Sequence, residues 1–148
     1  MVTLTPGAQT LEWEVKLVGV PTSGQEGKEV VANWQVVEFS NDNTFYTDSN
    51  GLEMQKRVLD KRTGWTLNTI ERASSNYYPI NSAIAIKSAY SFNQVTVMND
   101  RSQGGSVLQN GGIEIMQNRR LLVDDIRGVE EPLNEVDSNG QGMQVNVK

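Results

Sequence analysis

Residues 45–58 have the sequence FYTDSNGLEMQKRV, which predicts a β-hairpin. The first residues are aromatic and β-branched, as is typical of strands. They lead into the pair Asn50-Gly51, and Asn-Gly tolerates the positive φ angles that tight hairpin turns require. From Leu52 to Val58, alternate side chains would share one face of the second strand and the intervening ones would share the other.

Similar short segments of strand-forming residues lie on both sides of this hairpin. No window carries the sustained i, i+3, i+4, i+7 spacing of a packed helix. Residues 1–10 are polar and turn-rich, so we expect them to be irregular. The further strands expected from alternation or β-branched content are 11–17, 29–39, 65–70, 84–86, 92–98, 113–116 and 143–147.

Many short strands separated by turn signals indicate an all-β fold, namely an antiparallel β-sandwich. A length of 148 residues fits a single domain spanning 1–148. Because the strand at 143–147 is cut short by the end of the chain, we expect the sheet to continue beyond Lys148. The chain is therefore expected to be a fragment of a larger β-sandwich region.

Composition excludes several classes of function. The net charge of -5 argues against a nucleic-acid partner, which would need a basic face. No apolar run approaches the roughly 18 residues of a spanning helix, so we expect no membrane partner. With no cysteine and no histidine, the chain has neither thiolate nor imidazole chemistry, and no metal site is expected in it. Only Asp, Glu, Lys, Tyr or Ser side chains remain for catalysis.

A dense charge cluster, which we define as Arg119–Pro132, follows the strand predicted at 113–116. Its adjacent acids Asp124 and Asp125 are an obvious candidate for a catalytic carboxylate pair, because glycoside hydrolysis requires two carboxyl groups. Neighbouring residues of an extended chain point to opposite faces, however, so these two would not flank one bond. Ion pairing with the arginines of the cluster is the simpler interpretation.

Two aromatic residues, Tyr77 and Tyr78, are candidates for stacking on sugar rings. The alternative is that they fill a core with the hydroxyl bonded at its edge, as buried tyrosines commonly do. The same alternative holds for Trp13, Trp34 and Trp65.

Two polar loops resemble ligand sites only weakly. Residues 100–106 contain Gly104-Gly105 but lack the GK[ST] ending of a phosphate loop, so a glycine-rich turn is the better interpretation. Asp42, Asp48 and Asn50 lack the spacing of a calcium loop. Turns stabilised by Asp or Asn side chains explain them more simply.

Four stretches of the sequence form an ordered set: FYTDSNG at 45–51, NYYP at 76–79, DRSQGGS at 100–106 and RRL through DDxRGxxEP at 119–132. They occur in the order seen in glycoside hydrolase family 38, and the sequence most resembles the lysosomal or vacuolar acid α-mannosidases of that family. The resemblance covers about residues 28–147 and only the C-terminal sandwich region of much longer enzymes. Asn118 departs from the histidine often found there in the acid type.

The resemblance implies part of a larger supersandwich of the galactose-mutarotase type and no catalytic residue in this chain. Zinc is implied for the parent enzyme, on domains outside this chain. The arginine of the DDxRG motif, here Arg127, is implied to reach the mannose site, with loop support from Asp124, Asp125, Arg120 and Gly128. The alternative is that Arg127 is paired only within the sandwich.

We therefore expect the non-catalytic C-terminal part of a retaining, zinc-dependent α-mannosidase that acts on mannose-containing glycans in a lysosome or vacuole. Its expected partners are the remaining domains of that parent, or a second copy meeting exposed strand edges. The alternatives are a stand-alone carbohydrate- or protein-binding module, and a sandwich that only buttresses the parent's other domains.

Overall fold

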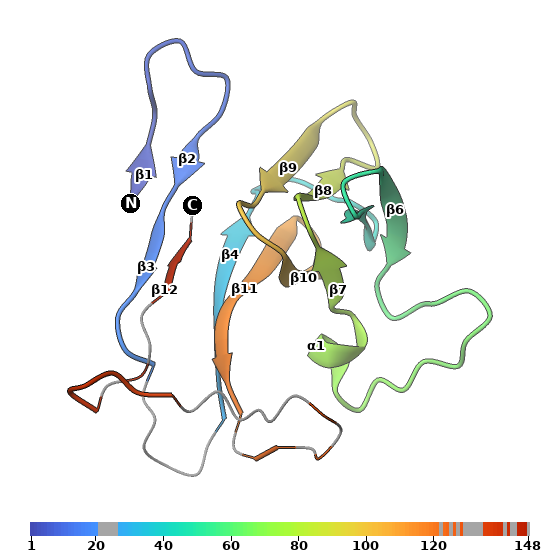
Figure 1. Cartoon of the computed structure of the whole chain (residues 1–148). Coiled ribbons are helices and arrows are strands. Elements are labelled where there is room, and N and C mark those ends of the chain that lie inside the picture. The colour runs from blue at the N-terminus through green and yellow to red at the C-terminus, as the bar shows by residue number, and fades with distance from the viewer. Residues whose placement is uncertain are drawn as a thin grey trace. The chain divides into compact units, whose positions relative to one another are not determined.

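The computed structural model describes residues 1–20, 27–121, 123, 124, 126, 128, 135–140, 142 and 145–147 (Figure 1). Within this part of the chain, no helix has the length and hydrophobicity needed to cross a membrane. The helix α1 (Arg72–Ser75) is a single turn. The strands are β1 (Val2–Thr3), β2 (Glu12–Trp13), β3 (Val15–Leu17), β4 (Lys28–Gln35), β5 (Thr44–Ser49), β6 (Glu53–Val58), β7 (Tyr78–Ile80), β8 (Ala83–Lys87), β9 (Gln94–Met98), β10 (Gln103–Gln109), β11 (Gly112–Arg120) and β12 (Val145–Val147).

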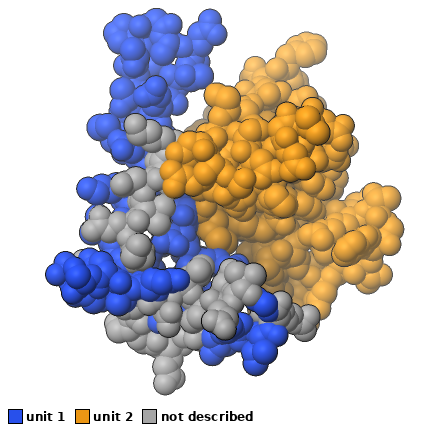
Figure 2. Space-filling view, in the orientation of Figure 1, with its two compact units in different colours: residues 1–30, 117–148 blue, residues 31–116 orange. Residues whose placement is uncertain are grey.

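The strands form two four-stranded sheets with the orders β4-β11-β10-β7 and β6-β5-β8-β9. Two further pairs are β1-β2 and β12-β3. The chain divides into two compact units, unit 1 with residues 1–30 and 117–148 and unit 2 with residues 31–116 (Figure 2). That the chain is one domain stays a prediction.

The hydrophobic core of unit 2 draws side chains from both four-stranded sheets. Side chains alternate between the two faces of a strand. The strands β8 and β10 each bury three consecutive residues, Ile84–Ile86 and Gly105–Val107, so both of their faces are covered at these positions. The buried cluster is Phe45, Tyr78, Ile80, Ile84, Ile86, Val107, Ile113 and Ile115, with Trp34, Val36, Phe39, Val95 and Val97 packed against it. This arrangement confirms the predicted all-β sandwich class.

The predicted β5-β6 hairpin is confirmed in its strands and its turn. Six residue pairs run in antiparallel register from Thr44↔Val58 to Ser49↔Glu53. Asn50 and Gly51 have φ angles of 53° and 70°, the left-handed conformation that Asn-Gly turns supply.

In unit 1, two short strands, β2 and β3, replace the single strand expected at residues 11–17. Residues 11–17 divide into β2 and β3 around Glu14, whose N–H donates to the carbonyl oxygen of Met1 at 2.8 Å. The prediction that residues 1–10 are irregular is wrong at β1, where Val2 pairs with Trp13. The predicted final strand is observed as β12, antiparallel to β3.

Two local predictions are wrong in unit 2. No strand forms at 65–70, where Trp65 and Ile70 are 69% and 85% exposed on a loop. Gly104 and Gly105 lie inside β10 rather than in a turn. The reason is close packing: a Cβ on Gly105 would lie 2.0 Å from Ile80 Cδ1 and 2.9 Å from the carbonyl oxygen of Glu114.

Candidate functional site

The charge cluster begins in a strand, because Arg119 and Arg120 are the last two residues of β11. Two guanidinium nitrogens of Arg120, Nε and Nη1, are buried and have no hydrogen-bond partner among the described residues. A buried donor without an acceptor is unfavourable. Arg120 is therefore a side chain with unused capacity for an anionic or carbonyl partner.

Beyond β11, the described part of the cluster shows an Asp-stabilised turn. Asp124 Oδ1 accepts the backbone N–H of Ile126 at 2.7 Å, and Ile126 has a φ of 61°. Gly128 has a φ of 99°, which glycine adopts at little cost. Asp124 thus hydrogen-bonds within its own loop. Arg127 and Asp125 lie outside the described residues, and their predicted roles stay predictions.

Tyr77 is half-buried and packs against β10 and β11 within unit 2. Its hydroxyl donates to Glu114 Oε1 across to β11. Its ring covers the backbone at Gly104, where an added Cβ would lie 3.1 Å from Tyr77 Cδ1. The absence of a side chain at Gly104 makes room for this ring, so the two residues form one packing unit.

Tyr78 is 9% exposed and belongs to the core cluster. It packs edge-on against Phe45 with ring centroids 5.8 Å apart. The guanidiniums of Arg57 and Arg62 lie 4.3 and 5.0 Å from the centre of its ring. Sugar stacking needs an open aromatic face, so this placement fits the alternative in which Tyr78 fills the core.

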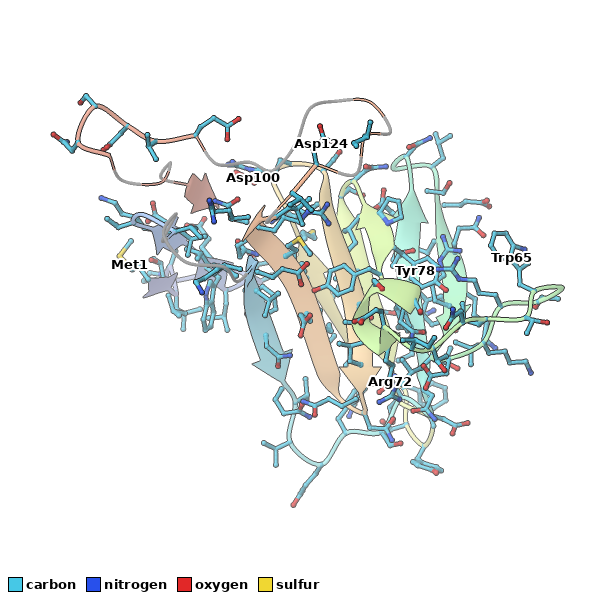
Figure 3. All side chains as sticks on the ribbon, turned by 90° about the horizontal axis from the view of Figure 1, so that it is seen from below. Met1, Trp65, Arg72, Tyr78, Asp100 and Asp124 are labelled. Atoms are coloured by element: carbon cyan, nitrogen blue, oxygen red, sulfur yellow. The ribbon has the colours of Figure 1, made fainter. Side chains whose placement is uncertain are left out.

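A loop from Lys61 to Glu71 carries the exposed Trp65. The guanidinium of Arg62 lies 5.6 Å from the centre of the Trp65 ring, and its Nε donates to the Tyr78 hydroxyl at 3.3 Å. Figure 3 shows Trp65 on the outer side of this loop, with Tyr78 further in toward the strands. Arg62 therefore bridges an exposed aromatic ring and a buried one.

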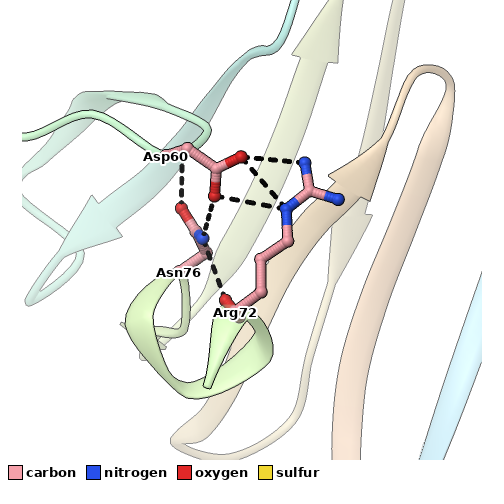
Figure 4. A network of polar contacts seen from close by, with 3 residues as sticks. All are labelled: Asp60, Arg72 and Asn76. Atoms are coloured by element: carbon pink, nitrogen blue, oxygen red, sulfur yellow. Dashed lines mark hydrogen bonds and ion pairs between the residues drawn. The ribbon is translucent and has the colours of Figure 1, made fainter. Parts of the chain in front are cut away.

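The two ends of this loop are tied together by Asp60, Arg72 and Asn76 (Figure 4). Asp60 Oδ2 accepts from Arg72 Nε at 3.0 Å and from Nη2 at 2.9 Å, and Asp60 Oδ1 accepts from Asn76 Nδ2 at 2.8 Å. The fully buried Asn76 also accepts the backbone N–H of Asp60 at 2.8 Å. The hydrogen bonds from Arg72, and then that from Asn76, hold the pKa of the Asp60 carboxyl below its ordinary value.

Asp48 forms a second carboxylate-centred junction. It accepts backbone N–H groups from Gly51 at 2.8 Å, Asn81 at 2.7 Å, Ser82 at 2.9 Å and Ala83 at 3.2 Å. Burial raises its pKa, but these four donors outweigh burial and lower the pKa to about 2. The Asp48 carboxylate thus stabilises the turn at Asn50-Gly51 and the backbone at 81–83, in agreement with the predicted turn-stabilising role.

The described residues contain no group of three or more His, Cys, Asp or Glu placed to hold a metal ion. The full sequence also lacks the histidine and cysteine that zinc sites favour. The residues of this chain that the structure describes do not fit a zinc centre.

The position of Arg57 and Arg62 against Tyr78 was not expected from sequence. A basic run, QKRVLDKR at 55–62, is the one signal that could have drawn attention to it in an otherwise acidic chain. Alternation puts Arg57 on one face of β6 but cannot say which aromatic residue it meets. Tyr77, Tyr78 and the two arginines belong to unit 2, whereas Arg120, Asp124 and Gly128 belong to unit 1.

Comparison with known proteins identifies the family. Residues 2–127 match the family described as the glycosyl hydrolases family 38 C-terminal domain. The chain belongs to this family. The match covers most of the sequence, so the family 38 resemblance inferred from the four motifs is confirmed.

Relatives of the family 38 chain include lysosomal alpha-mannosidases from several organisms. The mouse protein is 46% identical over 93% of this chain, and the human protein is 45% identical over 98% of it. The lysosomal alpha-mannosidase of Dictyostelium discoideum is 38% identical over 89%. The chain spans only 13–14% of the length of these relatives.

Proposed function

We propose that this family 38 chain is the C-terminal β-sandwich part of a retaining, zinc-dependent α-mannosidase that removes terminal α-mannose from oligosaccharides. One observation carries the proposal: the family match over residues 2–127 together with relatives named lysosomal alpha-mannosidase. The same names support a lysosomal or vacuolar compartment for the parent.

In this proposal, the chemistry resides on domains outside this chain. The chain aligns with about one-seventh of its human relative, whose remaining length is ample for a catalytic domain. Zinc, when bound to the parent, would supply Lewis-acid assistance. The described residues here offer no matching ligand set. In the proposal, the chain contributes the β-sandwich of unit 2 and the charge cluster that contains Arg127.

Arg127 is proposed to hydrogen-bond substrate or a catalytic carboxylate. A guanidinium presents five N–H donors in a planar fork suited to sugar hydroxyls and to carboxylates. Support for the loop comes from Asp124, which bonds the N–H of Ile126, and from the left-handed Gly128 beside Arg127. The finer role of each residue is part of the proposal.

The isolated chain tests whether catalysis lies elsewhere. We expect no hydrolysis of an aryl α-mannoside and no saturable binding of mannose oligosaccharides by calorimetry. Turnover above blank that survives repurification would overturn the non-catalytic assignment. Saturable oligosaccharide binding that is lost in Arg127→Ala would favour a stand-alone binding module instead.

The full-length parent tests Arg127 itself. Loss of one charged hydrogen-bond donor that acts in the transition state lowers rate by about 10²–10³-fold, so we expect a drop of that order in kcat/KM for Arg127→Ala. Arg101→Ala is the matched control, because Arg101 is an exposed arginine already bonded to Asp100 at 2.8 Å. An unchanged kcat/KM for Arg127→Ala would leave only a buttressing role for the sandwich.

A further inference from the structure

Four side chains of unit 2 form what we call the arginine–aromatic ladder: Arg57, Tyr78, Arg62 and Trp65. Arg57 and Arg62 lie 4.3 and 5.0 Å from the centre of the Tyr78 ring, and Arg62 lies 5.6 Å from that of Trp65. Cation–π attraction stabilises a guanidinium at such distances. The ladder runs from the hydrophobic core to an exposed indole.

Within the described part of the chain, the two guanidiniums of the ladder donate to neutral hydrogen-bond acceptors. Arg57 Nε donates to Thr47 Oγ1 at 3.1 Å, and Arg62 donates to the Tyr78 hydroxyl at 3.3 Å and the Ser75 carbonyl at 3.0 Å. Two ion pairs within 4.0 Å, Arg72–Asp60 and Arg101–Asp100, are formed by described residues, and neither includes a ladder arginine.

The acid nearest in sequence is already engaged. Asp60 lies between Arg57 and Arg62 in the chain, but its carboxylate oxygens bond Arg72 and Asn76. Both ladder arginines are half-buried, so water screens them less than it screens a fully exposed side chain. Two positive charges on one ring, with no carboxylate supplied by the described residues, are an electrostatic site that lacks its counter-charge.

The local charge also stands out against the rest of the chain. Residues 55–62, QKRVLDKR, carry four basic side chains and one acidic, while the whole chain has a net charge of -5. Next to these charges, the indole of Trp65 is 69% exposed. Arginine beside an exposed tryptophan is the composition of energetically important protein interfaces.

We infer that the arginine–aromatic ladder is a docking surface for a carboxylate-bearing segment of the parent mannosidase outside these 148 residues. The inference rests on the proposed function, because the relatives extend far beyond the part matched here. Among the described residues, Arg57 uses only its Nε, in the bond to Thr47, so its two Nη groups remain to donate to a bidentate carboxylate. Trp65 supplies flat apolar area that a polypeptide can cover and a small anion cannot.

A photo-cross-link in the full-length parent tests this docking surface. Replacement Trp65→p-benzoylphenylalanine puts the probe on the ladder, and mass spectrometry of the irradiated, digested enzyme maps its target. We expect an intramolecular cross-link to a peptide outside these 148 residues that contains Asp or Glu. Cross-linked dimers, adducts confined to these 148 residues, or no adduct would each overturn the inference.

Substitutions of the ladder arginines test whether positive charge directs the docking. In the photoprobe background, Arg57→Gln with Arg62→Gln should lower the cross-link yield at least fivefold. Arg101→Gln, an exposed arginine paired with Asp100, should leave the yield unchanged. Equal yields in the two variants would contradict a charge-directed contact. Melting temperature and aryl α-mannoside hydrolysis, measured on the same samples, show whether each variant is folded. If the double variant misfolds, Arg62→Lys and Arg62→Gln replace it. Because lysine keeps the positive charge, Arg62→Lys should lower the cross-link yield less than Arg62→Gln does.

The same experiment separates the two proposals. A parent that hydrolyses α-mannoside but gives no outside cross-link retains the proposed function and loses the docking surface. A parent that gives the cross-link but hydrolyses no α-mannoside retains the docking surface and loses the proposed function.

Discussion

At the scale of single residues, Asp48 holds the β5-β6 turn and the residues leading into β8 with one carboxylate. Its folded pKa of about 2 lies below its ordinary value of 3.8 because four backbone N–H groups bond the charged form. A carboxyl with a lowered folded pKa stabilises the protein above the unfolded pKa. That contribution is lost as the pH falls from about 4 to about 2.

Asp48→Asn should therefore destabilise the chain by about 2 kcal/mol at pH 7, with the difference shrinking below pH 4. Urea unfolding of both proteins between pH 2 and pH 7 measures this. The matched control is Asp42→Asn, the same change at an exposed turn residue, which should alter stability by less than about 0.5 kcal/mol. A constant difference across the pH range would contradict the role assigned to the Asp48 charge.

At the scale of elements, the loop from Lys61 to Glu71 contains no helix or strand, and hydrogen bonds of Asp60 with Arg72 and Asn76 hold its two ends together. Asn76 is fully buried and bonds both the backbone and the carboxylate of Asp60. The turn at Asp60 needs this support because its φ is 58°, a conformation that non-glycine residues adopt at a cost. Without the hydrogen bonds between Asp60 and Asn76, the ladder residue Trp65 would lose its position.

Asn76→Ala should cost about 2 kcal/mol, because the fully buried Asn76 amide would lose its hydrogen bonds to the backbone N–H and carboxylate of Asp60 and to the carbonyl oxygen of Arg72. It should also speed tryptic cleavage after Lys61 and Arg62. Urea unfolding and mass-spectrometric digestion follow the two effects. Asn68→Ala is the control, since Asn68 is exposed and its side chain bonds the N–H of Ile70 within the same loop. Equal cleavage rates for the two variants would show that the loop does not depend on its base.

At the scale of the whole molecule, some edges of the sheets pair with no other strand in the part of the chain that the structure describes. β6 and β9 are the outer strands of one four-stranded sheet, and they expose Met54 to 43% and Met98 to 64%. An unpaired edge with apolar side chains favours pairing with another chain. Such edges suit a piece of a longer enzyme better than a free-standing module.

We therefore expect the isolated chain to self-associate at high concentration. Sedimentation velocity should show oligomers that shift toward monomer in Met54→Lys with Met98→Lys. Leu52→Lys, at a side chain that is 87% exposed outside these strands, should change nothing. A clean monomer at millimolar concentration would count against exposed edges as the site of association.

Most of the strands, the hairpin turn and the family could be predicted from the sequence alone. Alternation in residues 45–58 specifies two faces, and Asn50-Gly51 specifies the turn, because both are local consequences of backbone geometry. The four motifs are linear patterns of residues, so they identify family 38 without reference to the fold. Without histidine and cysteine, the chain has no imidazole and no thiolate side chain.

Which side chains contact one another could not be predicted from the sequence, because these contacts join segments that are distant in the chain. Gly104 and Gly105 have the composition of a turn, yet they lie in β10 because Tyr77 and Ile80 occupy the space that their side chains would need. Trp65 was expected in a strand, yet it projects from a loop closed by Asp60 and Asn76, which are 16 residues apart. Arg57 and Arg62 converge on Tyr78 through such long-range packing. Sequence periodicity encodes the face on which a side chain lies, whereas its partner depends on how distant segments fold together.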